Sequence, residues 1–224
     1  MLAAAGGAPL GSQRARHRIV TWLRLRRWIA DLPVELLFEN ARALGLPTGH
    51  ALNPGRGWVR EQVLGDALVL GLAVLGLDPG RPDDPQVVPA SIWRSARINP
   101  TILWDHCRPH LERMGELAAI RWARDGSNIL RPMGGCDVVT LLGSRTLRAA
   151  LVRDAAGMRP VVAPMRNRGW TVLSRLDPAF APAAAEATDP HERGFRRPVL
   201  VTADEVVLAA EGPRTIQDAL GGAA

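Results

Sequence analysis

The sequence feature that most constrains the fold is an apolar run in the first half of the chain, VLGDALVLGLAVLGL at residues 63–77. Asp66 interrupts the run, which is shorter than the roughly 20 residues that a membrane-spanning helix needs. Other parts of the chain therefore have to cover it, and it predicts a buried helix over about 58–77. A chain of 224 residues with 47% hydrophobic residues is long and apolar enough to supply that cover.

The rest of the first half also has a helical pattern. Apolar residues recur at helical spacing over 17–30, with Ile29 on the apolar side and Arg27 away from it. A second helix is predicted over 34–44, because a proline precedes it and a glycine follows it. The proline-rich segment after the apolar run is typical of a linker. We expect a flexible tail at 1–13, a basic helical region at 14–77 and a linker at 78–90.

The second half mixes helical and strand-like segments. Helices are predicted at 90–96, 100–123, 145–156 and 170–188, and strands at 137–142 and 159–164. The order strand, helix, strand is the pattern of a βαβ unit with a parallel pair. A hairpin is predicted at 198–209, turning at Ala203-Asp204.

These elements predict an α+β fold, with a helical N-terminal half and a small α/β C-terminal region that contains the βαβ unit. We place helices in 91–125, the α/β region in 130–212 and a tail in 213–224.

The charge of the chain is segregated. All 28 basic residues are arginine, and the abundance of Ala, Gly, Arg and Pro follows GC-rich codons, which indicates a high-GC bacterium as the source. Arginine richness alone is therefore weak evidence of function. Residues 1–60, however, hold nine arginines and three acids, whereas the rest holds nineteen of each. The whole net charge of +6 lies in the first sixty residues, which indicates a polyanionic partner.

Two tryptophans lie among the arginines of this basic region. Guanidinium groups bind phosphates and stack on bases, and tryptophan offers a stacking surface. The candidate nucleic-acid-binding residues are Arg14, Arg16, Arg18, Trp22, Arg24, Arg26, Arg27 and Trp28. The alternatives are a solvated helix face in an arginine-rich protein and a helix lying on a membrane surface.

The next segment, Asn40 to Thr48, resembles the first helix and the turn of bacterial helix-turn-helix regulators. In that family a Leu-Gly-apolar turn precedes a Thr or Ser that opens the recognition helix, which implies DNA binding. The chain departs from the pattern at Asn53-Pro54-Gly55, which would break the recognition helix after one turn. A helix that simply ends at a glycine is the alternative.

Potential metal ligands gather around residue 106. His106 and His110 are four residues apart, which places them on one face of a helix, and Cys107, Glu112 and Cys136 could add ligands. Pro109 lies between the histidines and there is no CxxC, so we favour a structural role and predict no metal. Cys136, after two glycines, could be a nucleophile with His106 or His110 as base, but a small buried residue is the simpler interpretation.

A candidate anion site lies where the helix at 145–156 begins. Ser144, Arg145 and Arg148 occupy a helix N-terminus, where backbone N–H groups attract anions. The alternative is that Ser144 only caps the helix. The chain has no GxGxxG and no lysine for a P-loop, which argues against Walker-type nucleotide hydrolysis.

Two segments near the C-terminus resemble the end of PIN-domain ribonucleases. Asp177 precedes an Ala-rich helix pattern, and a strand pattern ends in Thr-Ala-Asp204. The resemblance implies that these acids, with Asp137, hold a divalent metal for phosphodiester cleavage. Asp137 departs from the family because it begins its strand, and the family's mid-domain Glu has no counterpart. A β-turn role for Asp204 is the alternative.

The leading hypothesis is a non-enzymatic, cytoplasmic bacterial protein that binds nucleic acid, DNA or RNA, and is an accessory protein of a mobile element or phage. Only two cysteines and no signal-peptide pattern favour the cytoplasm, and no membrane span and no cofactor are predicted. A metal-dependent nuclease and an assembly protein with an acidic protein partner are the alternatives.

Overall fold

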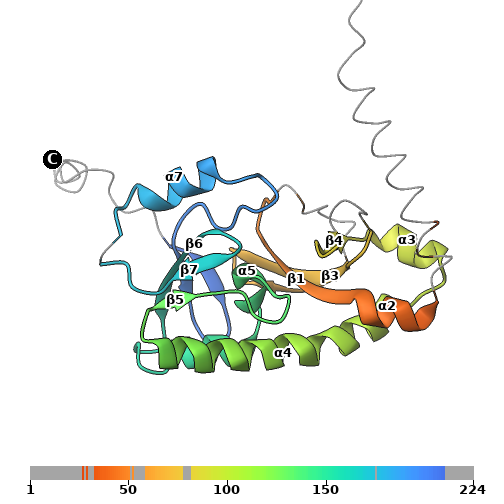
Figure 1. The fold of residues 1–224 in the computed structure, drawn as a ribbon, viewed down its shortest axis with the longest axis horizontal. Helices are drawn as coiled ribbons and strands as arrows, with labels where there is room; N and C mark the ends of the chain where they lie inside the picture. The colour runs from red at the N-terminus through yellow and green to blue at the C-terminus, as the bar shows by residue number, and fades with distance from the viewer. Residues whose placement is uncertain are drawn as a thin grey trace, which may run out of the picture. The chain divides into compact units, whose positions relative to one another are not determined.

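The computed structural model shows an α+β fold (Figure 1). It describes residues 27, 29, 33–50, 52, 59–77, 82–174 and 176–209. Contacts group the chain into two compact units. The first comprises 1–42, 54–59 and 72–107, and the second comprises 43–53, 60–71 and 108–224.

One sheet is built from the first half of the chain. Its strand order is β1-β3-β2, and β4 also pairs with β3. The strands are β1 (Ala41–Pro47), β2 (Arg60–Leu64), β3 (Leu68–Val74) and β4 (Gln86–Val87). Both β2 and β4 run antiparallel to β3, and every residue of β3 is buried. The central part of the apolar run is therefore buried, as predicted, but it forms strand β3 and not a helix.

The second sheet belongs to the C-terminal half and has the order β5-β7-β6-β8-β9. Figure 1 labels its first three strands, β5, β7 and β6. Every neighbouring pair in it is antiparallel. Its strands are β5 (Ile129–Leu130), β6 (Arg159–Met165), β7 (Arg168–Trp170), β8 (Val199–Val201) and β9 (Val206–Leu208).

Within the described residues the structure has six helices with defined bounds. They are α2 (Val34–Asn40), α3 (Ala90–Ser95), α4 (Pro100–Asp125), α5 (Val138–Leu141), α6 (Arg145–Val152) and α7 (Phe180–Ala187). Among the described residues no helix is both long and apolar enough to cross a membrane.

The first sheet approaches α5 closely at Gly45. The Gly45 N–H donates to the Thr140 hydroxyl at 3.0 Å. A Cβ at Gly45 would lie 2.8 Å from the Thr140 Cα, so a side chain there would force β1 away from α5. A glycine that looks like a helix stop in the sequence therefore serves a close backbone contact.

The predicted helical N-terminal half is wrong for the described residues between 33 and 77. The helix predicted over 34–44 ends at Asn40, and β1 follows it. The same strand replaces the first helix of the helix-turn-helix resemblance, which is therefore also wrong. The segment predicted as a helix over 58–77 instead contains the hairpin of β2 and β3. Gly65 and Asp66 lie in the turn between these two strands.

The predicted βαβ unit is also wrong, since the segment 137–142 is not a strand. Asp137 accepts a hydrogen bond from the Thr140 N–H at 2.9 Å and caps the short helix α5. The strand at 159–164 is confirmed as β6, but its neighbours are antiparallel. The helix predicted over 170–188 is shorter in the structure, where α7 comprises Phe180–Ala187. Trp170 is the last residue of β7.

Candidate functional site

The basic N-terminal segment falls mostly outside the described residues. Those outside are Arg14, Arg16, Arg18, Trp22, Arg24, Arg26 and Trp28. Arg27 and Ile29 are described, and both have helical backbone. Arg27 is exposed and Ile29 is buried, which is the arrangement that the helical pattern predicts for these two residues.

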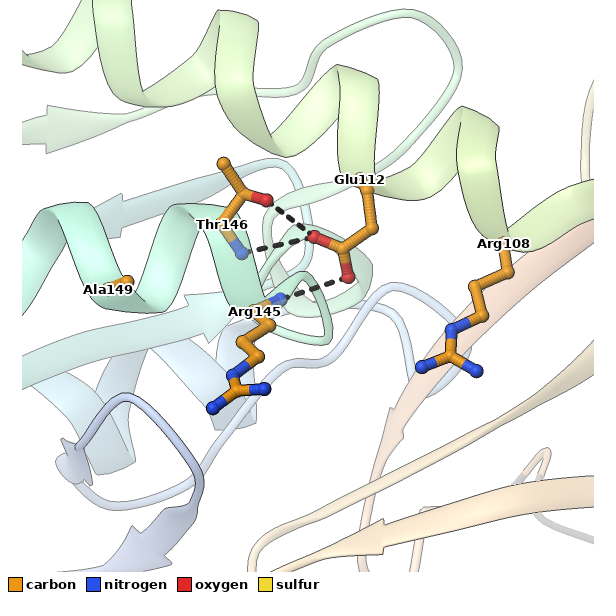
Figure 2. A pocket seen from close by; sticks show the side chains of 5 residues that line it. All are labelled: Arg108, Glu112, Arg145, Thr146 and Ala149. Carbon is orange, nitrogen blue, oxygen red and sulfur yellow. Dashed lines mark hydrogen bonds between the residues drawn. The ribbon is translucent and has the colours of Figure 1, made fainter.

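The best-defined polar network in the second unit lies where α6 begins. Ser144 is the N-cap residue, and its hydroxyl accepts from the Leu147 N–H at 3.3 Å. The predicted helix start at Ser144 is therefore confirmed. The carboxylate of Glu112, from α4, lies against the same helix end (Figure 2).

Glu112 accepts four hydrogen bonds there. Its Oε2 accepts from the hydroxyl of Ser144 at 2.8 Å, and from the N–H and the hydroxyl of Thr146 at 3.0 and 2.8 Å. Its Oε1 accepts from the Arg145 N–H at 3.1 Å. Three of these bonds reach Oε2 and one reaches Oε1, so both oxygens of the carboxylate are engaged by the start of α6. The anion on the N-terminus of α6 is thus supplied by the chain itself.

Hydrogen bonding also sets the charge state of Glu112. Partial burial raises the pKa of its carboxyl, but the hydrogen bonds from Thr146, Ser144 and Arg145 outweigh burial and lower the pKa below its ordinary value. Donors that bond only to the charged form stabilise it. Glu112 is therefore an anion at neutral pH, and the positive end of the α6 dipole adds to its stabilisation.

A glycine sets the spacing between α4 and α6. A Cβ on Gly115 would lie 2.5 Å from the Ser144 Cβ, so only a glycine lets α4 pack this closely on the Ser144 side chain. Together with the Glu112 hydrogen bonds, this contact fixes the two helices against each other.

Of the predicted anion-binding arginines, Arg148 is buried and bound to backbone carbonyls. Its Nη1 donates to Leu142 O at 2.9 Å and to Gly143 O at 2.8 Å, and its Nε donates to Ala203 O at 3.1 Å. Burial lowers the pKa of its guanidinium. Its donors tie the end of α5 to the β8–β9 turn.

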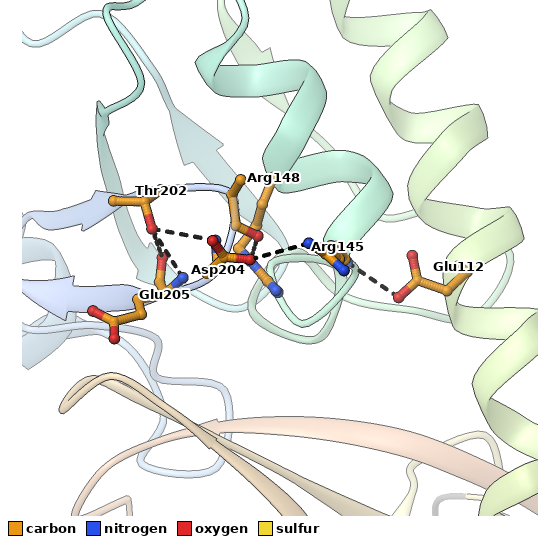
Figure 3. Close-up of polar contacts among 7 residues, drawn as sticks. Glu112, Arg145, Arg148, Thr202, Asp204 and Glu205 are labelled. Carbon is orange, nitrogen blue, oxygen red and sulfur yellow. Dashed lines mark hydrogen bonds and ion pairs between the residues drawn. The ribbon is translucent and has the colours of Figure 1, made fainter.

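Arg145, by contrast, extends into solvent. Its Nη2 lies 3.4 Å from Asp204 Oδ1, and the two side chains are 76% and 75% exposed. Asp204 sits in the β8–β9 turn, where the Thr202 hydroxyl accepts from the N–H groups of Asp204 and Glu205 (Figure 3). The predicted hairpin with its turn at Ala203-Asp204 is confirmed. An ion pair this exposed is weak.

An open pocket of about 410 Å³ lies beside the Glu112 carboxylate. Two residues of α4, Arg108 and Glu112, and three of α6, Arg145, Thr146 and Ala149, line it (Figure 2). On each helix the lining residues include a pair four positions apart, and such a pair lies on one face. Arg108 and Arg145 bring two guanidinium groups to the pocket.

The potential metal ligands around residue 106 do not come together in the described part of the chain. Nowhere in the described part of the chain do three His, Cys, Asp or Glu side chains gather so that they could hold a metal ion. His106 packs edge-on against Phe38, and a ring nitrogen of His110 lies 3.2 Å from Gly134 O. Cys136 is buried in a tight turn that two hydrogen bonds close with Met133.

The three carboxylates of the PIN-domain resemblance have separate local roles. Asp137 pairs with Arg166, with Oδ2 2.5 Å from Nη2, and their side chains are 21% and 10% exposed. Asp177 accepts from the Ala179 N–H at 2.8 Å, just before α7. Asp204 pairs with Arg145. Across the described ranges these acids form no metal-binding group.

One buried histidine, His50, was not identified as a candidate from the sequence. His50, which follows β1, is 9% exposed, and its Nδ1 accepts from the Leu52 N–H at 3.1 Å. Its buried Nε2 has no hydrogen-bond partner among the described residues. Burial, with the charges of Arg166 and His191, lowers the pKa of His50 to about 4. A lone histidine in a loop gives no sequence signal for such a position.

Comparison with protein-family models, curated proteins and solved structures finds no match to this chain. The assignment of function therefore depends on the residues of the chain alone.

Proposed function

We propose that this chain is a nucleic-acid-binding protein whose basic segment, residues 14–28, contacts phosphates and bases. The observation that carries the proposal is the segregation of charge, since the entire net charge of +6 lies in residues 1–60. Codon bias would spread arginine excess along the chain, whereas residues 61–224 are balanced. A local excess of arginine next to tryptophan provides both phosphate binding and base stacking.

The exposed side chain of Arg27 and the burial of Ile29 support the same proposal. A helix that keeps its apolar side in the core can present its arginines to a ligand. Nuclease activity is not part of the proposal, because no metal-binding group of acids is found among the described residues.

The test is binding of the full chain to labelled duplex and single-stranded DNA and RNA across a salt series. Each phosphate contact contributes to the salt dependence, so six contacts lower the affinity about 10³-fold between about 50 and 200 mM salt. Replacing the six arginines Arg14, Arg16, Arg18, Arg24, Arg26 and Arg27 by Gln is expected to remove most of the affinity and to flatten the salt slope.

The matched control replaces six exposed arginines elsewhere and has the same net charge. They are Arg94, Arg113, Arg124, Arg131, Arg153 and Arg168. This variant is expected to keep at least half of the salt slope. Equal losses in both variants, or no binding by the unaltered chain, would contradict the proposal. Absence of nucleic-acid binding together with saturable binding to an acidic protein would favour the assembly alternative.

A further inference from the structure

We propose that Arg131 and Arg168, which lie opposite each other at the end of two neighbouring strands, form a second contact for the phosphate backbone of a nucleic acid. This inference rests on the proposed function, because it assigns an additional point of contact to the same ligand. Its support is the register of the sheet, the exposure of both side chains and the lack of acids bound to them among the described residues.

The register of β5 and β7 brings the two arginines together. These strands are antiparallel neighbours (Figure 1), and Leu130 lies opposite Gly169. The next pair in the same register is Arg131, directly after β5, and Arg168, the first residue of β7. Side chains of opposite residues lie on the same face of a sheet, with Cβ atoms about 5 Å apart.

The preceding pair shows which face the arginines occupy. Leu130 is buried, and a Cβ on Gly169 would lie 3.0 Å from Val138 Cγ1, so this face packs against α5. Successive side chains of a strand point to opposite faces. Arg131 and Arg168 therefore point away from α5, and both are exposed.

The charges of these two arginines are not balanced by an acid within the described residues. No hydrogen bond or ion pair there involves either guanidinium group. Asp137 reaches the turn just before Arg168, but it is paired with Arg166. Like charges directly opposite each other in a sheet repel and destabilise it. An anion that binds both guanidinium groups removes this repulsion.

A phosphate backbone fits the pair better than an acidic peptide does. Two guanidinium groups whose side chains start about 5 Å apart can bind the free oxygens of one phosphodiester or of two successive phosphates. A carboxylate is already matched by a single guanidinium fork, so a peptide has to bring two acidic side chains to the same place. The net charge of +6 in residues 1–60 independently favours a polyanionic ligand.

The experiment measures binding of the full chain to labelled single-stranded and duplex nucleic acid across a salt series. Arg131→Gln combined with Arg168→Gln is expected to lower the slope of log affinity against log salt by about one to two, because each phosphate contact contributes about 0.9 on duplex DNA. The matched control is Arg113→Gln combined with Arg153→Gln, which removes two exposed arginines and the same charge. It is expected to change the slope by less than about half a unit.

Arg131 and Arg168 also belong to the control variant in which six arginines outside the basic segment are replaced. That variant loses at most two of about eight phosphate contacts and is expected to keep at least about three quarters of the salt slope. Retention of the whole slope would overturn the inference.

Thermal unfolding separates ligand binding from a structural role. Replacing two facing like charges relieves their repulsion, so the Arg131→Gln, Arg168→Gln variant is expected to unfold at the temperature of the wild type or slightly above it. A lower unfolding temperature with an unchanged salt slope would assign the pair to the fold and overturn the inference.

The outcomes also distinguish this inference from the proposed function. If replacing the six arginines of the basic segment abolishes binding while the Arg131→Gln, Arg168→Gln variant keeps the wild-type slope, only the second contact is wrong. If the slope falls in that double variant but not in the six-arginine variant, the second contact stands and the role of the basic segment is wrong. Polyglutamate binding that is as tight as nucleic-acid binding and depends equally on the pair would assign it to an acidic protein and overturn the inference.

Discussion

The carboxylates of Glu112 and Asp137 are both held by several hydrogen bonds, but the donors differ in kind. Glu112 is bound by two backbone N–H groups and two hydroxyls. Asp137 is bound by the guanidinium of Arg166 and by the N–H and hydroxyl of Thr140. Both lie in the second unit of the chain.

The difference decides what the neighbouring arginines can do. At Asp137 the arginine is buried and committed to the carboxylate. At Glu112 neutral groups satisfy the carboxylate, and the guanidinium of Arg145 extends into solvent next to a pocket. A buried ion pair specifies local structure through its cation, whereas a carboxylate that caps a helix end is stabilised without one.

The largest expected effect comes from breaking the Asp137–Arg166 pair. Arg166→Met leaves the carboxylate of Asp137 largely buried without its cation, which is expected to destabilise the fold by about 3 kcal/mol. Chemical denaturation measures this. The control is Asp137→Asn combined with Arg166→Met, in which the amide can still cap α5. If the double variant is as unstable as the single one, the unpaired charge is not the cause.

The second prediction concerns the pH dependence of the Asp137 neighbourhood. Burial, together with the charges of Arg166 and His191, lowers the pKa of His50 to about 4, against the opposing effects of Arg193 and Asp137. The unfolded chain takes up this proton near pH 6.5 and the folded chain only near 4. Stability from neutral His50 is therefore complete above about 6.5 and is lost as the pH falls towards 4, by roughly 3 kcal/mol.

Denaturation of the wild-type chain and of His50→Asn between pH 7 and 4 measures that contribution. Asparagine does not titrate and can still accept from the Leu52 N–H. The variant is expected to lose stability at neutral pH but to show a much smaller decline between about 6.5 and 4. Parallel curves for the two proteins would show that His50 is not the titrating group.

The sequence predicts local features better than the contacts between distant segments. The Ser144 N-cap, the long helix α4 and the β8–β9 hairpin depend on residues a few positions apart, and each is confirmed. The apolar run predicts a helix, but a fully buried strand has the same apolar composition, so the pattern alone does not distinguish the two. Gly65-Asp66 looked like an interruption, and it is a hairpin turn.

The candidate site shows the same limit. The bond from Ser144 to Glu112 joins residues 32 positions apart, and no spacing in the sequence indicates it. The role of Gly115 is equally invisible, because a glycine inside a helix pattern does not reveal what packs on it. Arg145 and Arg148 looked alike as members of one helix turn. Only the tertiary structure shows that Arg148 is buried on carbonyls while Arg145 is exposed.

The third prediction tests the spacing of the two helices at the Glu112 site. Gly115→Ala places a methyl group against Ser144, so α4 and α6 must separate, which is expected to cost about 1–3 kcal/mol. The Glu112 hydrogen bonds are expected to lengthen with the separation. The control is Gly126→Ala, where a Cβ has no neighbour within 4 Å but the backbone has a positive φ of 57°. Chemical denaturation measures both variants, and an equal loss of stability would contradict a specific role for the Gly115 contact.

The smallest effect is expected from removing the charge of Glu112 while keeping its shape. Glu112→Gln keeps one acceptor oxygen for α6 but loses the charge-assisted bonds, and it is expected to lower stability by about 1–2 kcal/mol at neutral pH. Because the folded pKa of Glu112 is lowered, its contribution is present above the ordinary carboxyl pKa and is lost as the pH falls through the folded value. The difference between wild type and variant is thus expected to vanish in acid. Chemical denaturation at neutral pH measures the effect, and equal stability of the two proteins would contradict a role for the charge of Glu112.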